Sequence, residues 1–121
     1  MFNFEKLTVY QKALDFTNDV FVHTNNWPQK FQFSIADQIR RASLSIPLNI
    51  AEGSSKTKQE FKRFLSISRG SCNECIPLVE IAYKQKLISL KIKENWYNQL
   101  LYLAKMLSSL RRSISKQPST K

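Results

Sequence analysis

The clearest chemical spacing in this sequence is a pair of cysteines, Cys72 and Cys75, separated by two residues. Zinc and redox sites use this spacing, but a tetrahedral zinc site needs four ligands and the chain has no second cysteine pair. Both cysteines also fall on the apolar stripe of a predicted helix, and a thiol in apolar surroundings keeps its proton and is inert. We therefore predict two buried structural cysteines, with no metal and no cofactor.

Catalysis has little to build on. His23 is the single histidine, so acid–base or nucleophilic chemistry based on histidine would have to pass through it, and we expect it on a helix surface. The two glycines, Gly53 and Gly70, are too far apart to form a glycine-rich phosphate-binding loop. No catalytic residue is predicted, and an enzyme is the least favoured class of function.

Positive charge is the strongest functional signal. The net charge is +10, but residues 1–52 hold five basic and five acidic residues. Residues 53–121 hold fourteen basic and four acidic residues, so they carry all of the excess, and such asymmetry indicates a polyanionic partner. Long cationic side chains bind phosphates and release condensed counterions. The candidate nucleic-acid-binding residues form two clusters, Lys58, Lys62 and Arg69 on one predicted helix and Lys105, Arg111, Arg112 and Lys116 on the next.

This charge pattern leaves three interpretations open: contact with RNA or DNA, a merely solvated surface, or an acidic protein partner. No sequence-reading module is recognisable, so nucleic-acid binding would use the phosphate backbone and shape. Tyr102 lies near the second cluster and offers an aromatic ring on which a base can stack.

Apolar residues repeat at steps of three and four along the chain, which predicts helices at about 8–26, 34–52, 57–86 and 90–115. The expected fold class is all-α, an antiparallel up-down four-helix bundle in a single domain of residues 1–115. Residues 116–121 are expected to be a disordered basic tail. Expected N-caps are Thr8, Ser34 paired with Asp37, Thr57 paired with Glu60, and Ser89.

Two prolines fall inside these predicted helices. Pro47 removes the backbone bond to the Ser43 carbonyl and predicts a kink, and Pro77 predicts a bend in the same way. Gly53 is expected to end the second helix. Trp27, Phe31 and Phe33 surround the first interhelical loop and are expected to cover the end of the bundle.

The second helix is apolar on two sides, so it needs to be covered twice. One stripe, including Ile39 and Ile46, suits the interior of the bundle. The opposite stripe predicts contact with a second subunit, and a partial stripe on the fourth helix is a possible matching surface for head-to-tail assembly into a ring. The predicted homo-oligomer interface is Leu44, Leu48, Ala51, Tyr97 and Leu101.

The middle of the chain also carries a recognisable set of residues: Gln38-Ile39-Arg40-Arg41-Ala42, Ser45-Ile46-Pro47, Asn49-Ile50-Ala51-Glu52-Gly53, Glu60-Phe61 and Phe64-Leu65. This set resembles the signature of the 23S rRNA-intervening sequence protein family. The resemblance covers nearly the whole chain, and it implies a four-helix subunit that assembles into a ring of five and has a poorly defined function. The family motif includes Arg41, Asn49 and Glu52, for which we expect a structural polar cluster that sets helix register or an interface.

Relatives of similar fold, the accessory proteins of diversity-generating retroelements, form basic pentameric barrels that work with a reverse transcriptase. The resemblance therefore implies an alternative function, a protein-docking module for such a partner. No segment has the length of apolar sequence that a membrane span needs, and no export signal is recognisable, so we expect a cytoplasmic protein that does not contact a membrane.

Overall fold

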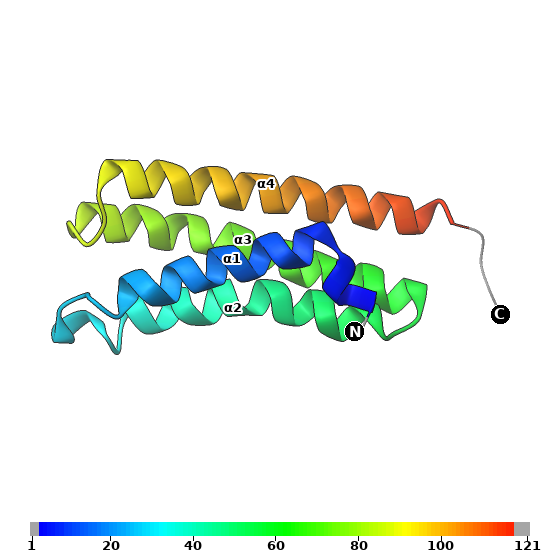
Figure 1. The fold of residues 1–121 in the computed structure, drawn as a ribbon, viewed down its shortest axis with the longest axis horizontal. Helices are drawn as coiled ribbons and strands as arrows, with labels where there is room; N and C mark the ends of the chain where they lie inside the picture. Colours follow the sequence, from blue (N-terminus) through cyan, green and yellow to red (C-terminus); the bar gives the residue numbers. More distant parts are fainter. Residues whose placement is uncertain (1–2, 118–121) are drawn as a thin grey trace.

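The computed structural model describes residues 3–117, and these form four long α-helices and no strand. The helices are α1 (Thr8–Thr24), α2 (Ile35–Ser54), α3 (Lys58–Lys84) and α4 (Leu90–Ser115), with short 3-10 helices at η1 (Asn3–Lys6) and η2 (Gln29–Phe31). Figure 1 shows the four helices lying side by side, each running back along the one before it. The predicted all-α four-helix bundle is confirmed.

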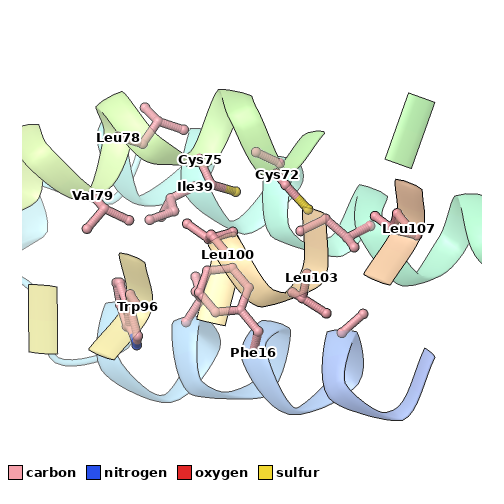
Figure 2. Close-up of a cluster of buried hydrophobic side chains, with 14 of the residues drawn as sticks. Phe16, Ile39, Cys72, Cys75, Leu78, Val79, Trp96, Leu100, Leu103 and Leu107 are labelled. Atoms are coloured by element: carbon pink, nitrogen blue, oxygen red, sulfur yellow. The ribbon is translucent and has the colours of Figure 1, made fainter. Parts of the chain in front are cut away.

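The core is drawn from one face of each helix. Phe16 of α1, Ile39 of α2 and Leu65 of α3 are buried, as are Trp96 and Leu100 of α4. The rings of Phe16 and Trp96 meet edge to face with centroids 6.1 Å apart, an arrangement that adds to the energy of area burial (Figure 2). Helices α2 and α3 share the largest interface, and α1 and α4 share the smallest among the four neighbouring pairs.

Helix starts agree with the sequence at two of the four expected caps. Thr57 and Glu60 form the predicted reciprocal capping box, and the Ser89 hydroxyl accepts from the Ile92 amide at 3.1 Å. Thr8 is not a cap, because the η1 turn leads directly into α1 and Leu7 occupies the N-cap position. Ser34 precedes α2, but its hydroxyl donates to the Phe31 carbonyl and makes no cap bond.

Pro47 sits inside α2, and the helix continues past it. A proline leaves the carbonyl four residues earlier without its helical donor, which here is the Ser43 carbonyl. The Thr17 hydroxyl of α1 lies 2.9 Å from this oxygen and donates to it, sharing its hydrogen with the Ala13 carbonyl. The predicted kinks at Pro47 and Pro77 stay predictions, because what the structure shows is continuous helix through both positions.

Close approach of α2 and α3 depends on small side chains. A Cβ atom on Gly53 would lie 2.5 Å from the Cβ of Phe64, so only glycine fits there. Gly53 does not end α2 as expected, since Ser54 is the last helical residue. Ser68 donates to the Ile46 carbonyl at 2.8 Å, which adds a polar link between the two helices.

Hydrogen bonds from Arg40 hold the loop between α1 and α2 in place. Its Nε donates to the Thr24 hydroxyl at 2.9 Å, and another guanidinium nitrogen donates to the Gln32 side chain, which in turn bonds the Thr24 carbonyl at 2.8 Å. Trp27 is buried, but Phe33 is 87% exposed, so the expectation that Phe33 covers the bundle end is wrong. Of the predicted tail, residues 118–121 lie outside the described residues, and Lys116 and Gln117 directly follow α4.

Candidate nucleic-acid interface

A groove between α3 and α4 brings together three arginines from both predicted basic clusters. Arg69 lies on α3, and Arg111 and Arg112 lie near the carboxyl end of α4. We call this feature, with a volume of about 330 Å³, the arginine groove. Its remaining lining consists of Leu65, Ser66, Gly70, Asn73, Leu107 and Ser108.

The arginine groove is positioned by the same seam that forms the core. Leu65 and Leu107 are buried beneath it, so each helix turns one flank inward and leaves the adjoining flank at the surface. Because α3 and α4 run in opposite directions, the amino-terminal half of α3 lies beside the carboxyl-terminal half of α4 (Figure 1). Residues about 40 positions apart in sequence thus meet on one surface.

The charges of the three arginines are open to an incoming anion. All three are exposed, and within residues 3–117 none has a carboxylate at ion-pair distance. Two ion pairs lie away from the groove, on α2 and at its carboxyl end, at Arg41–Asp37 (3.0 Å) and Lys56–Glu52 (3.2 Å). A guanidinium carries five donors in a planar fork that matches the oxygens of a phosphate, so an anion in the groove would meet unused donors from two helices.

The other predicted basic residues do not all join this groove. Lys62 lies two helical turns before Arg69 and therefore shares its flank of α3. Lys58 is half-buried in the first turn of the same helix. Lys105 is exposed and is absent from the groove lining, while Lys116 is the exposed C-cap residue of α4.

The cysteines lie in the core, as predicted. Figure 2 shows both sulfur atoms directed from α3 into the interior, among leucines of α4. Burial raises the pKa of the Cys72 thiol to about 12, and burial with the nearby Cys72 raises the pKa of Cys75 further still. Both side chains are therefore neutral thiols at physiological pH, and the described residues contain no group of three potential metal ligands.

The predicted polar cluster needs correction, since its three residues have separate partners. Arg41 forms an ion pair with Asp37, and Glu52 forms one with Lys56. In each pair the partners lie four residues apart in sequence, on the solvent-facing side of α2 or just past its end. Asn49 instead donates to the carbonyl and the hydroxyl of Ser45, at 2.7 and 2.9 Å. The Ser45 hydroxyl lies 2.8 Å from that of Ser71, so the polar link to α3 runs from Ser45, which belongs to the family motif, to Ser71, which sequence reasoning did not single out.

The predicted interface residues are at the surface of this subunit. Leu48 is 57% exposed and, with half-buried Ala51, lines a hollow beside Phe4 of η1. Leu44 is also exposed, one turn before Leu48. Tyr97 is 48% exposed and lines the outer face between α3 and α4, with exposed Leu101 one turn further along α4.

Comparison with known proteins identifies the family of this chain. A model of the 23S rRNA-intervening sequence protein family matches residues 5–109. The chain belongs to this family. The matched range includes Arg69 and ends before Arg111, so the family match does not itself extend to the two arginines of α4. No curated protein matches the chain.

A solved structure supports the fold of this 23S rRNA-intervening sequence protein. It is the crystal structure of a protein of unknown function from the S23 ribosomal protein family of Bacteroides thetaiotaomicron. The two proteins are 24% identical, with a TM-score of 0.78, over 86% of this chain and 95% of the other. This likeness establishes the four-helix fold, and neither match indicates an enzyme family. Within residues 3–117, no helix is both long and apolar enough to cross a membrane.

Proposed function

We propose that this 23S rRNA-intervening sequence protein is a non-enzymatic, oligomeric four-helix bundle that binds RNA or DNA through the phosphate backbone. The observation that carries the proposal is the arginine groove, where Arg69, Arg111 and Arg112 converge from two helices and, among the described residues, have no carboxylate at ion-pair distance. Arginine is the side chain best suited to planar, two-pronged contact with phosphate oxygens. Three such groups beside one groove suit a polyanion better than a single charged protein side chain.

Binding through phosphates is the expected mode because three guanidinium groups dominate the lining and the chain has no recognisable sequence-reading module. Serine and asparagine in the groove (Ser66, Asn73 and Ser108) add short polar contacts to phosphate or sugar oxygens. Lys62 extends the positive flank along α3, and Lys116 extends it past the end of α4. Affinity should therefore depend strongly on salt and weakly on sequence.

Assembly would strengthen this binding. The exposed apolar residues Leu48 and Tyr97 lie on different helices, and this is the arrangement that a head-to-tail contact requires. A ring of five subunits, which the family resemblance implies, would repeat the arginine groove around the assembly. Linked sites on one strand raise the overall affinity above that of any single site.

The proposal is tested by measuring affinity for structured RNA, single-stranded RNA and duplex DNA by fluorescence anisotropy over a series of salt concentrations. Binding with a steep decline of log affinity against log salt and similar affinity for unrelated sequences supports it. Absence of binding to all three probes at low salt overturns it. A protein-docking function, with a partner such as a reverse transcriptase, would then take first place.

A further inference from the structure

A second concave surface lies on the other flank of α4, facing α1. We call it the amide crevice, and its volume is about 520 Å³. It forms between α1 and α4, which share the smallest interface among the four neighbouring helix pairs. Its lining residues are Lys12 and Asp15 from α1 and Asn95, Asn98, Gln99, Tyr102 and Leu103 from α4.

The polar groups of the amide crevice are mainly neutral amides. Asn98 is exposed, and its side-chain amide makes no hydrogen bond to any other residue within residues 3–117. Gln99 donates to the Asn95 side chain and lies 3.4 Å from an Asp19 carboxylate oxygen, so these contacts orient its amide. Each amide offers a donor and an acceptor side by side. This is the pairing that asparagine and glutamine use on the edge of a nucleobase.

The amide crevice also has the surfaces that a flat ring needs. Tyr102 is 43% exposed, so one part of its ring is open to solvent. Leu103 is buried and forms an apolar floor next to it. Bases of single strands characteristically stack on aromatic side chains and bond through their exposed edges. A bare phosphate suits the crevice less well, because Asp15 would repel it and Lys12 is the single cation in the lining.

The two concave surfaces flank the same helix. Arg111 lies on the side of α4 that faces α3, and Tyr102 lies on the side that faces α1. Nine residues separate them in sequence, which is about 14 Å along a helix axis. A nucleic-acid strand that crosses α4 can therefore contact both surfaces of one subunit.

We infer that the amide crevice binds an unpaired base of a single-stranded nucleic acid whose phosphates contact the arginine groove. This inference rests on the proposed function and refines it, because it makes single strands the preferred ligand. A paired base keeps its edge and faces inside the duplex, so the duplex gains nothing from the crevice.

The test compares a single-stranded RNA of about 16 nucleotides, the upper site size of common single-strand-binding domains, with its own duplex. Tyr102→Leu removes the aromatic ring from an exposed position, and Tyr102→Phe is the matched control that keeps it. We expect Tyr102→Leu, and separately Asn98→Ala, to weaken single-strand binding about tenfold while duplex affinity stays unchanged. The salt slope should not change in any of these variants, because none removes a charge.

The outcomes separate this inference from the proposed function. If Tyr102→Leu leaves single-strand affinity unchanged, or weakens duplex binding equally, the amide crevice is not a base site and the proposed function stands. If Tyr102→Phe loses as much affinity as Tyr102→Leu, stacking is excluded and the inference is overturned. If the unmodified protein binds neither probe at low salt, this inference fails, and the proposed function fails with it when structured RNA and duplex DNA are not bound either.

Discussion

The hydroxyl of Thr17 on α1 donates to the Ser43 carbonyl of α2 at 2.9 Å, and Ser43 is the residue whose carbonyl Pro47 leaves without a helical donor. Both Thr17 and Ser43 are buried, so water does not replace this bond. A side chain on one helix thus supplies the hydrogen bond that a proline removes from its neighbour. This contact lets a proline occupy a buried position in α2.

Replacing Thr17 with valine should destabilise the fold by about 1–3 kcal/mol, because it leaves a buried carbonyl without a donor at nearly constant side-chain volume. Chemical denaturation measures the loss. Pro47→Ala provides the control, since alanine restores the backbone donor to Ser43. The loss from Thr17→Val should be smaller in the Pro47→Ala background, and equal losses in both backgrounds would show that the Thr17 bond does not compensate for the proline.

The two glycines should respond in opposite directions to alanine. A Cβ on Gly53 would lie 2.5 Å from Phe64 Cβ and 2.9 Å from Phe61 Cδ1, so Gly53→Ala should destabilise by about 1–3 kcal/mol. Gly70 has nothing within 4 Å of the same position, so Gly70→Ala should stabilise α3 by about 0.5–1 kcal/mol. Urea unfolding of both variants checks the pair. A stabilising Gly53→Ala would contradict the close packing of α2 on α3.

Hydrophobic periodicity was sufficient to predict the helices, because a step of three and four residues records which face of each helix is buried. The Thr57 and Ser89 caps were also predictable from local sequence, because an N-cap bond joins residues only three positions apart. Contacts between helices leave no such local signal. Thr17 with Ser43 and Ser45 with Ser71 join residues 26 positions apart, and no spacing in the sequence relates them.

For the candidate site, too, the sequence predicted which residues are involved but not how the packing of the helices brings them together. The charge pattern singled out Arg69 and Arg111 as members of two separate basic clusters on two predicted helices. Only the antiparallel packing of α3 on α4 brings them to one groove. The family motif drew attention to Arg41, but the guanidinium that bridges α1 and α2 belongs to its neighbour Arg40. Sequence order did not reveal which of the two faces α1.

The cysteines should make the protein less stable at alkaline pH. Burial raises the pKa of Cys72 from about 9 to about 12, so the unfolded chain loses thiol protons at lower pH than the folded chain does. The unfolded state then binds fewer protons, and stability falls as pH rises from about 9 towards 12. A variant with Cys72→Ala and Cys75→Ala should be modestly less stable at neutral pH and lose less on going to alkaline pH. Denaturation at several pH values checks both, and a steeper alkaline loss in the variant would contradict the burial argument.

The same double variant addresses metal binding. We expect unchanged metal content, assembly and nucleic-acid affinity, because neutral buried thiols are poor ligands. Elemental analysis of protein purified without added metal makes the comparison. Stoichiometric zinc that disappears in the variant would contradict a purely structural role for the cysteines.

Assembly should depend on the exposed apolar face of α2. Sedimentation is expected to show several subunits for the unmodified protein, and Leu48→Glu should dissociate them because it places a charge in an apolar contact. Circular dichroism verifies that the variant remains folded, which is expected for a side chain that is 57% exposed. A monomer before mutation, or an undisturbed oligomer in folded Leu48→Glu, would contradict this interface.

The central claim, that the arginine groove binds the phosphate backbone, is tested most directly by comparing two variants of equal charge. One carries Arg69→Gln and Arg111→Gln. The control carries Lys84→Gln and Lys91→Gln, exposed residues at the end of α3 and the start of α4, at the opposite end of the bundle from Arg111. Measured against duplex DNA, the arginine variant should lose affinity and flatten the slope of log affinity against log salt by about 2, while the control stays close to the unmodified protein. Equal effects of the two variants would mean that diffuse positive charge, and not the groove, holds the nucleic acid.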